Sequence, residues 1–265
     1  MKRLLLVLFV LSTKLSFAQI AVAYVTADQA VQALLGPGVT YANPVFTGVA
    51  QQLGQMTGNT NTNFQIAEGI VLGCSDAQEI VPNFLGTAIT PNISGDPDLL
   101  SVANSVPPLI GQTFTVGSVN NIASLEFDFI ATGTTLSFNY IFGSDEYLTW
   151  VNSQYNDVFA FFLSGPGITG PYASPAGFPG GAVNIAIVPQ SAPPLPITIS
   201  SVNNVLNIPY YVDNATDAVP ISLNGFTVKI AAEHELECGQ TYHIRLAIAN
   251  GSDQALKSDV IIEAG

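Results

Sequence analysis

A regular alternation of apolar and polar residues in the middle of the chain restricts its fold more than any other feature. Residues 123–130 place three large apolar side chains on one face of an extended chain and two acidic ones on the other. Residues 136–142 repeat this alternation. A period of two is that of a β-strand with one buried face. A Gly-Thr turn at 133–134 lies between the runs, so we expect them to form an antiparallel hairpin.

Further short runs with strand character follow. Residues 158–163 are apolar throughout, as expected of a strand that is buried on both faces. Residues 242–249 alternate again, with His243 and Arg245 on the polar face. Many short strands separated by Gly, Pro and Asn turns predict an all-β fold, an antiparallel β-sandwich resembling a jelly roll.

One or two short helices are expected, both in the N-terminal part. Residues 28–35 have apolar residues at helical spacing, with Asp28 as the predicted N-cap and a Gly-Pro-Gly stop at 36–38. A second short helix is expected over residues 99–105, ended by the Pro-Pro pair at 107–108.

The first 18 residues have the layout of a secretory signal peptide. A basic start is followed by an apolar run over residues 4–11 and by small residues up to Ala18. The apolar run is shorter than the roughly 20 residues that a membrane-spanning helix needs. Cleavage before Gln19 would leave residues 19–265 as a single exported domain, secreted or at the cell surface. No later stretch is long and apolar enough to form a transmembrane segment.

The charge balance excludes several classes of partner. After removal of the signal peptide, Lys229, Arg245 and Lys257 are the basic residues that remain against 19 acidic ones. Nucleic acid is excluded as a partner because phosphate binding depends on clustered Lys and Arg, and anionic lipid surfaces are disfavoured for the same reason. The acidic surface of the protein itself attracts cations, although it also keeps the protein soluble without any ligand.

Two cysteines, Cys74 and Cys238, remain in the exported chain. An even number in an oxidising compartment predicts a disulfide bond between them. The alternative is two buried free thiols. A zinc site is not indicated, since neither a CxxC motif nor a histidine partner accompanies them.

The stretch from residue 142 to residue 167 carries the candidate metal site. A loop between two predicted strands holds Asp145, Glu146, Asn156 and Asp157, in a chain with only 9% charged residues. Calcium takes six to eight oxygen ligands from such side chains, whereas zinc needs His or Cys and magnesium needs a rigid octahedron. We therefore expect these four residues to bind calcium. The alternative is that they hydrogen-bond to the backbone of the loop.

The same loop carries the candidate ligand-binding aromatics Tyr147, Trp150 and Tyr155. Asp213 and Asn214 lie on a distant segment that could converge on it. Aromatic faces beside carboxylates suit sugars and other polar ring-shaped ligands. Alternatively, the aromatic side chains anchor the base of the loop in the core.

Several motifs occur in an order that resembles a known family: GIVLGCSDAQ, LEFDF, LSFNYIFGSDEY, YNDVFAFFLSGPG, NIAIVP, YYVDN and GQTYHIRLAIAN. Together they resemble the choice-of-anchor L domain of bacterial surface and secreted proteins, from about residue 27 to the end of the chain. The resemblance implies an extracellular module, common in the Bacteroidota, that precedes further repeats and a sorting or anchoring segment.

The expected function is a non-catalytic adhesion or ligand-binding module, secreted or at the cell surface and stabilised by calcium at the acidic loop. Its expected partner is an extracellular glycan or a surface protein. The alternatives are a polysaccharide-acting enzyme, an accessory carbohydrate-binding domain or a structural spacer. No catalytic residue is predicted, because neither GxSxG nor HExxH accompanies His234 or His243.

Overall fold

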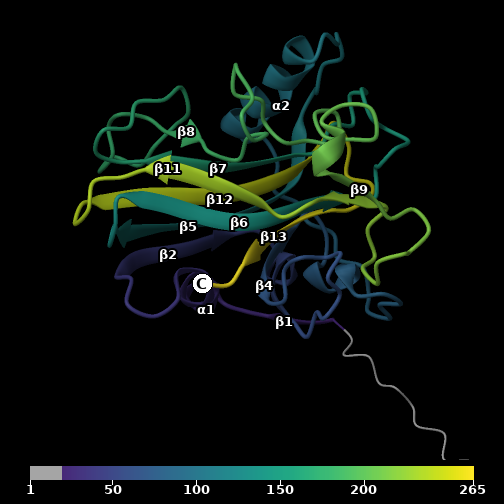
Figure 1. Ribbon diagram of the computed structural model, residues 1–265, viewed down its shortest axis with the longest axis horizontal. Coiled ribbons are helices and arrows are strands. Elements are labelled where there is room, and N and C mark those ends of the chain that lie inside the picture. Colours follow the sequence, from purple (N-terminus) through teal and green to yellow (C-terminus); the bar gives the residue numbers. More distant parts are fainter. Residues whose placement is uncertain (1–19) are drawn as a thin grey trace, which may run out of the picture.

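The computed structural model describes residues 20–265, so the predicted signal peptide over residues 1–18 lies outside the described residues. Two β-sheets face each other, with most strands running roughly along the long axis of the molecule (Figure 1). The strand pairs are antiparallel throughout the described chain. The predicted all-β sandwich is confirmed.

Sheet A has eight strands in the order β1-β3-β4-β13-β6-β10-β9, with β11 also paired to β6. Its strands are Ala21–Tyr24 (β1), Leu53–Thr57 (β3), Gly69–Gly73 (β4), Thr135–Ser144 (β6), Tyr211–Asp213 (β9), Gly225–Thr227 (β10), Ile230–Glu235 (β11) and Ser258–Glu263 (β13). Sheet B has five strands in the order β2-β5-β12-β7-β8. They are Tyr41–Thr47 (β2), Val119–Ile130 (β5), Val158–Ser164 (β7), Val183–Asn184 (β8) and Thr241–Gly251 (β12).

The main core lies between the two sheets. Alternate residues of β5 and β12 from sheet B meet those of β6 and β13 from sheet A. The Tyr140 ring of β6 packs edge-on against Phe159 and Phe161 of β7, with centroids 5.2 and 5.0 Å away. β7 is buried along its whole length, as predicted from its apolar sequence. This packing holds β6 and β7 face to face and thereby positions the loop that joins them.

The predicted hairpin between residues 123–130 and 136–142 is wrong. Both runs are strands with their apolar residues inward, but β5 belongs to sheet B and β6 to sheet A. β5 pairs with β2 on one side and β12 on the other, so neither of its edges is available to β6. Residues 131–134 carry the chain from one sheet to the other. Alternation identifies which face of a strand is buried, but not which strand lies beside it.

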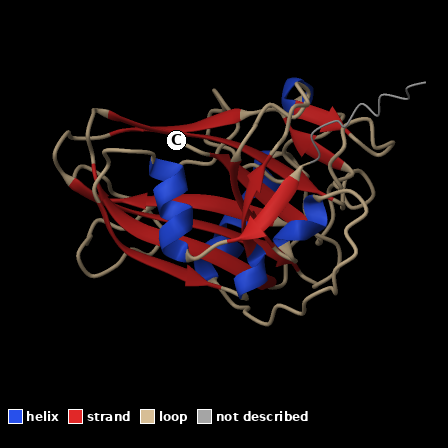
Figure 2. Ribbon diagram, turned by 90° about the horizontal axis from the view of Figure 1, so that it is seen from below, coloured by secondary structure: helices blue, strands red, loops and turns tan. Residues whose placement is uncertain are grey.

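Helix α1 (Ala27–Leu35) confirms the first predicted helix, but its N-cap is Thr26 and not Asp28. The Thr26 hydroxyl accepts a hydrogen bond from the Gln29 amide, and the Gln29 side chain accepts one from the Thr26 amide. This capping box satisfies two amides that a helix start leaves unpaired. α1 packs on β2, β3 and β4, with the C-terminus beside it (Figure 2).

Helix α2 (Pro97–Leu109) covers part of the outer face of sheet B, at the top of Figure 1, where it packs on β7 and β12. The second predicted helix is thus confirmed, but Pro107 and Pro108 lie inside its last turn. Proline has a helical φ but no amide to donate to the carbonyl four residues earlier, so these two residues add only their carbonyls to the hydrogen bonding at the end of α2. Here the Pro107 carbonyl accepts from the Gln112 amide. Over residues 20–265, no helix has both the length and the apolar character needed to cross a membrane.

The predicted disulfide is wrong, since Cys74 is a buried free thiol and Cys238 an exposed one. Cys74 lies next to the Ser144 end of β6, because its amide donates to the carbonyl of Ser258, which pairs with Ser144. Cys238 follows β11, near the Thr135 end of the same strand. The length of β6 separates the two cysteines by about 30 Å, whereas bridged Cα atoms lie within about 7 Å.

Candidate functional site

The acidic loop, residues 145–157, joins β6 of sheet A to β7 of sheet B and so crosses the sandwich at one end. The four predicted metal ligands lie at its two ends, beside the strands that hold it. The structure brings three of them into the interior and leaves the fourth outside: Glu146, Asn156 and Asp157 are buried, and Asp145 is partly exposed.

Asp145 belongs to a different set of contacts from the other three. Its Oδ2 forms an ion pair with Lys257 Nζ at 2.7 Å. Its Oδ1 accepts from the Asn224 amide at 3.2 Å, and its carbonyl accepts from the Asn224 side chain. Asp145 therefore ties the loop to sheet A and its carboxylate is already neutralised.

Glu146 and Asp157 form a buried carboxyl pair, 1% and 0% exposed. Asp157 Oδ1 accepts from the Gly251 amide, and its Oδ2 accepts from Asn250 Nδ2 and from the Ser258 hydroxyl, all at 2.7–2.8 Å. These donors come from β12 and β13, so Asp157 links the two sheets.

Burial raises the pKa of both carboxyls. For Glu146, desolvation is the largest cause, and the neighbouring charges of Asp157 and Asp253 add to the increase. For Asp157, desolvation again raises the pKa, and the hydrogen bonds from Gly251, Ser258 and Asn250 only partly oppose it. Two adjacent carboxyls in a low-dielectric site cannot both ionise without a compensating charge.

Oxygen atoms without a hydrogen-bond partner remain in this region. Glu146 Oε2 has none, and neither the carbonyl oxygen nor the amide nitrogen of the fully buried Asn156 side chain has one. Buried polar atoms are nearly always paired with protein, water or an ion. The acidic loop thus holds unused oxygen ligands beside Asp157.

No protein cation reaches the carboxyl pair within residues 20–265. Each Lys and Arg of this part is paired elsewhere: Lys229 with Glu263, Arg245 with Asp96 and Asp98, and Lys257 with Asp145. Among the same residues, no three His, Cys, Asp or Glu side chains converge as metal ligands. A cation at the acidic loop would therefore take two carboxylates, and its other ligands would be amide, carbonyl and water oxygens, which calcium accepts.

The aromatic residues of the loop divide into two pairs. Tyr147 is buried and its ring packs against Tyr211 at 5.0 Å, so it anchors the loop in the core. Trp150 is 39% exposed and meets the Tyr155 ring edge-on at 4.9 Å. Of the predicted ligand-binding aromatics, Trp150 and Tyr155 form the accessible pair.

Asp213 and Asn214 lie at the end of β9 and shape a separate loop. In the side chain of Asn214, Nδ2 donates to the carbonyls of Ile221 and Leu223, and Oδ1 accepts from the Val219 amide. The exposed Asp213 accepts from the Ala215 amide. These hydrogen bonds hold the segment 214–223, whose apolar residues cover the outer face of sheet A.

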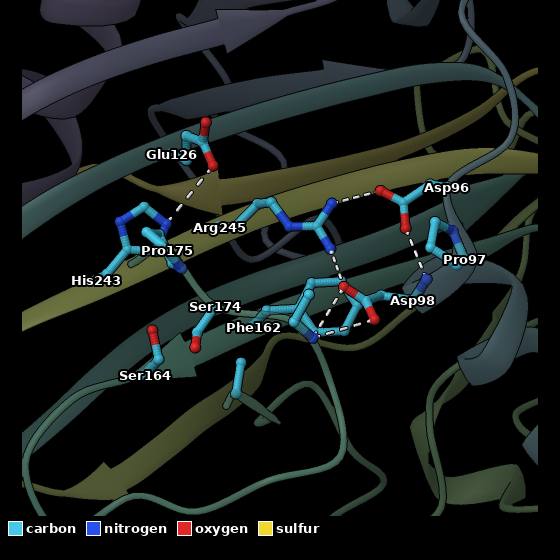
Figure 3. Close-up of a pocket in the computed structure, with 12 residues that line it drawn as sticks. Asp96, Pro97, Asp98, Glu126, Phe162, Ser164, Ser174, Pro175, His243 and Arg245 are labelled. Atoms are coloured by element: carbon cyan, nitrogen blue, oxygen red, sulfur yellow. Dashed lines mark hydrogen bonds and ion pairs between the residues drawn. The ribbon is translucent and has the colours of Figure 1, made fainter. Parts of the chain in front are cut away.

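A second candidate site, absent from the sequence predictions, is a pocket of about 280 Å³ on the outer face of sheet B. We call it the outer-face pocket. Residues of three strands, the N-terminal end of α2 and the loop after β7 surround it (Figure 3). It is lined by Asp96, Pro97, Asp98, Glu126, Phe162, Ser164, Ala173, Ser174, Pro175, Ala182, His243 and Arg245.

Two rows of side chains, each running across β5, β12 and β7, form the floor and the edge of the outer-face pocket. Asp128, His243 and Ser164 are neighbours across β5, β12 and β7. The adjacent row holds Glu126, Arg245 and Phe162 in the same strand order.

Arg245 is held in place on two sides. Its guanidinium lies 4.4 Å from the centroid of the Phe162 ring. One of its terminal nitrogens donates to Asp96 and the other to Asp98, the latter at 3.1 Å, from the start of α2. A guanidinium with partners on its edge and its face is rigidly oriented.

His243 lies between two carboxylates. Its Nδ1 is 2.8 Å from Asp128 Oδ1, and its Nε2 is 3.6 Å from Glu126 Oε2. Burial lowers the pKa of His243, but hydrogen bonding and the charges of Glu126 and Asp128 raise it by more, so the net shift is upward. The contact between His243 and Glu126 in turn lowers the pKa of Glu126.

The sequence did contain a signal for this pocket. The polar faces of 123–130 and 242–249 carry Glu126, Asp128, His243 and Arg245, in a chain with few cations. The pairing of β5 with β12 brings these faces together, and that pairing could not be read from the sequence.

Comparison with known proteins identifies the family. The family model of the choice-of-anchor L domain matches residues 19–265, so the chain belongs to this family, as its motifs predicted. No curated protein and no solved structure matches the chain.

Proposed function

From the membership of this chain in the choice-of-anchor L family, we propose that it is a non-catalytic adhesion and ligand-binding module outside the cell, with calcium bound at its acidic loop. The family's description supports a surface-associated role. The observation that carries the calcium proposal is the buried pair of Glu146 and Asp157, which no basic side chain of residues 20–265 reaches.

An ionised carboxyl pair is costly to bury without a positive partner, so it takes up either protons or a cation. At low pH, protons neutralise the pair. At neutral pH outside the cell, calcium supplies two positive charges and prefers the oxygen ligands that such a carboxyl pair offers. The unpartnered oxygens of Glu146 and Asn156 are suitable ligands, with Asp157 beside them.

The position of the acidic loop explains why a cation there would matter for adhesion. Asp157 is hydrogen-bonded to both β12 and β13, so a charge bound to it stabilises the end where the sheets join. The exposed Trp150 and Tyr155 pair is carried by the same loop. We expect calcium to order this pair for contact with a glycan or a surface protein.

Burial of the carboxyls favours a binding role over a glycosidase. The acid and nucleophile of a glycosidase must touch the sugar. Glu146 and Asp157 are 1% and 0% exposed, so a polysaccharide chain has no direct access to them.

Calcium should raise the melting temperature of the chelated protein at pH 8. For a dissociation constant of about 1 mM, as in extracellular modules, about 10 mM calcium contributes about 1.4 kcal/mol, or roughly 3–5 °C. We expect a smaller effect from magnesium. Glu146→Gln should abolish the shift, whereas Glu235→Gln, at an exposed position on β11, should retain it. Equal melting temperatures in calcium and EDTA would refute the site.

The pH dependence of stability, measured with and without calcium, is a second test of the site. The pKa of each carboxyl is raised in the folded state, so its stabilising contribution is complete below its ordinary value near 4 and declines as the pH rises. In EDTA the protein should therefore lose stability between pH 5 and pH 8. Calcium should restore it at pH 8 and have little effect at pH 5, where the carboxyls hold protons.

Ligand binding is tested separately with immobilised glycans and surface proteins, in calcium and in EDTA. Binding that requires calcium and is lost in Trp150→Ala supports the proposal. Turnover of a polysaccharide would contradict the non-catalytic assignment.

A further inference from the structure

We propose that the outer-face pocket on sheet B is a binding site for a neutral saccharide unit of the size of one pyranose ring. The site is independent of the acidic loop. Six residues along β7 separate Asp157 from Ser164, a distance of about 20 Å. The pocket volume of about 280 Å³ is just below the roughly 300–1,000 Å³ of sites for larger small molecules, which favours a ligand of a single ring.

An unused hydroxyl marks the pocket as a site for a polar ligand. Ser164 lines the pocket and is 1% exposed, yet its hydroxyl has no hydrogen-bond partner. Its cross-strand neighbour His243 forms a hydrogen bond through Nδ1 with Asp128, on the opposite side. A ligand hydroxyl would satisfy Ser164, because it can both donate and accept.

The charges of the pocket exclude simple ions. Four carboxylates face Arg245 and His243: Asp96, Asp98, Glu126 and Asp128. The surplus of negative charge repels an anion. Each of the four is already engaged by Arg245 or His243, which removes the main attraction for a cation. A neutral ligand that offers hydroxyl groups fits the mixture of donors and acceptors that remains.

The walls supply the apolar part of the site. Phe162, Pro97, Pro175, Ala173 and Ala182 line the pocket beside the polar groups. Charged side chains held rigid by one another, next to apolar surface, suit a sugar ring, which has hydroxyls at its edge and C–H groups on its faces. Figure 3 shows Arg245 between Glu126 on one side and Asp96 and Asp98, at the start of α2, on the other.

The test is a titration of the folded protein with free pyranoses, namely glucose, galactose, mannose and xylose, at tens of millimolar. Two-dimensional NMR reports binding through the His243 ring signals. We expect at least one sugar to shift these signals and to bind with a millimolar dissociation constant, in EDTA as well as in calcium. Failure of the calcium site would therefore leave this result unchanged, and the reverse also holds.

Two variants test the location. Ala173→Phe places a large side chain at an exposed position of the wall and should abolish binding. Ser164→Ala should weaken binding about three- to tenfold, the effect of one lost neutral hydrogen bond. Ser137→Ala, an exposed serine on β6, should bind like the original protein. The proposal is overturned if no sugar shifts the His243 signals, if Ala173→Phe still binds, or if only an amine such as methylammonium produces the shifts.

Discussion

His243 illustrates how individual residues of this chain acquire their properties from neighbours on other strands. On its own strand it is an outward-facing residue between two inward-facing ones. Its contacts with Asp128 and Glu126 come from β5, and the ring of Phe178 lies 5.6 Å away, from the loop after β7. The nearby Arg245 is held by Asp96 and Asp98.

Replacement of His243 should make stability less dependent on pH. The folded-state pKa of His243 is raised, so its contribution is fully present below the unfolded value of about 6.5 and is lost as the pH rises through the folded value. His243→Gln should therefore destabilise the protein more at pH 5.5 than at pH 8.5, as measured by urea unfolding. His234→Gln is the matched control, because the ring of this partly exposed histidine hydrogen-bonds to the carbonyl of Glu235 and forms no ion pair among the described residues. An equal loss at both pH values would contradict the ion-pair contribution.

At the scale of the elements, the start of α1 and the connection between β5 and β6 show where sequence patterns and structure differ. The capping box places the N-cap of α1 at Thr26, two residues before Asp28, and the short connection after β5 passes the chain from sheet B to sheet A. The capping box consists of local hydrogen bonds. The connection is held by hydrogen bonds to a distant segment, since Ala131 donates to the carbonyl of Gln240 and Thr134 accepts from the amide of Leu236. Propensity identified the helix and the strands, but these hydrogen bonds set where the elements begin and where they lead.

Thr26→Ala should lower the free energy of unfolding by about 1 kcal/mol, the usual effect of losing an N-cap hydroxyl. Thr26→Ser keeps the oxygen that accepts from the Gln29 amide and should stay within a few tenths of the original. Chemical denaturation of both variants measures the difference. A greater loss in Asp28→Ala than in Thr26→Ala would assign the cap to Asp28 instead.

For the whole molecule, the sandwich is stabilised by its core and by polar links between the sheets. The interior between the sheets collects apolar residues from nearly the full length of the described chain. At the end that carries the acidic loop, Asp157 bonds to Asn250 of sheet B and Ser258 of sheet A. The two cysteines lie at opposite ends of β6 and are free thiols, so a disulfide bond between them does not contribute to the stability of the sandwich.

Thiol labelling tests this arrangement. A thiol reagent should modify one cysteine, Cys238, in the folded protein and both after unfolding, because Cys74 is buried. A reducing agent should leave the melting temperature unchanged. Cys238→Ser should remove the labelling of the folded state. A reductant-sensitive melting temperature would indicate the disulfide that the sequence predicted.

Composition and periodicity were enough to predict the fold class, the inward faces of β5, β6 and β12 and both helices, and the resemblance of the ordered motifs was enough to predict the family. These features depend on residues close together in the chain, where burial and hydrogen bonding follow local spacing. The partners of β5, the free thiols, the separation of Asp145 from Glu146 and the whole outer-face pocket came only from the tertiary structure. Each of these features depends on how segments far apart in the sequence are placed relative to one another. No local pattern records which strands become neighbours when the two sheets close over one core.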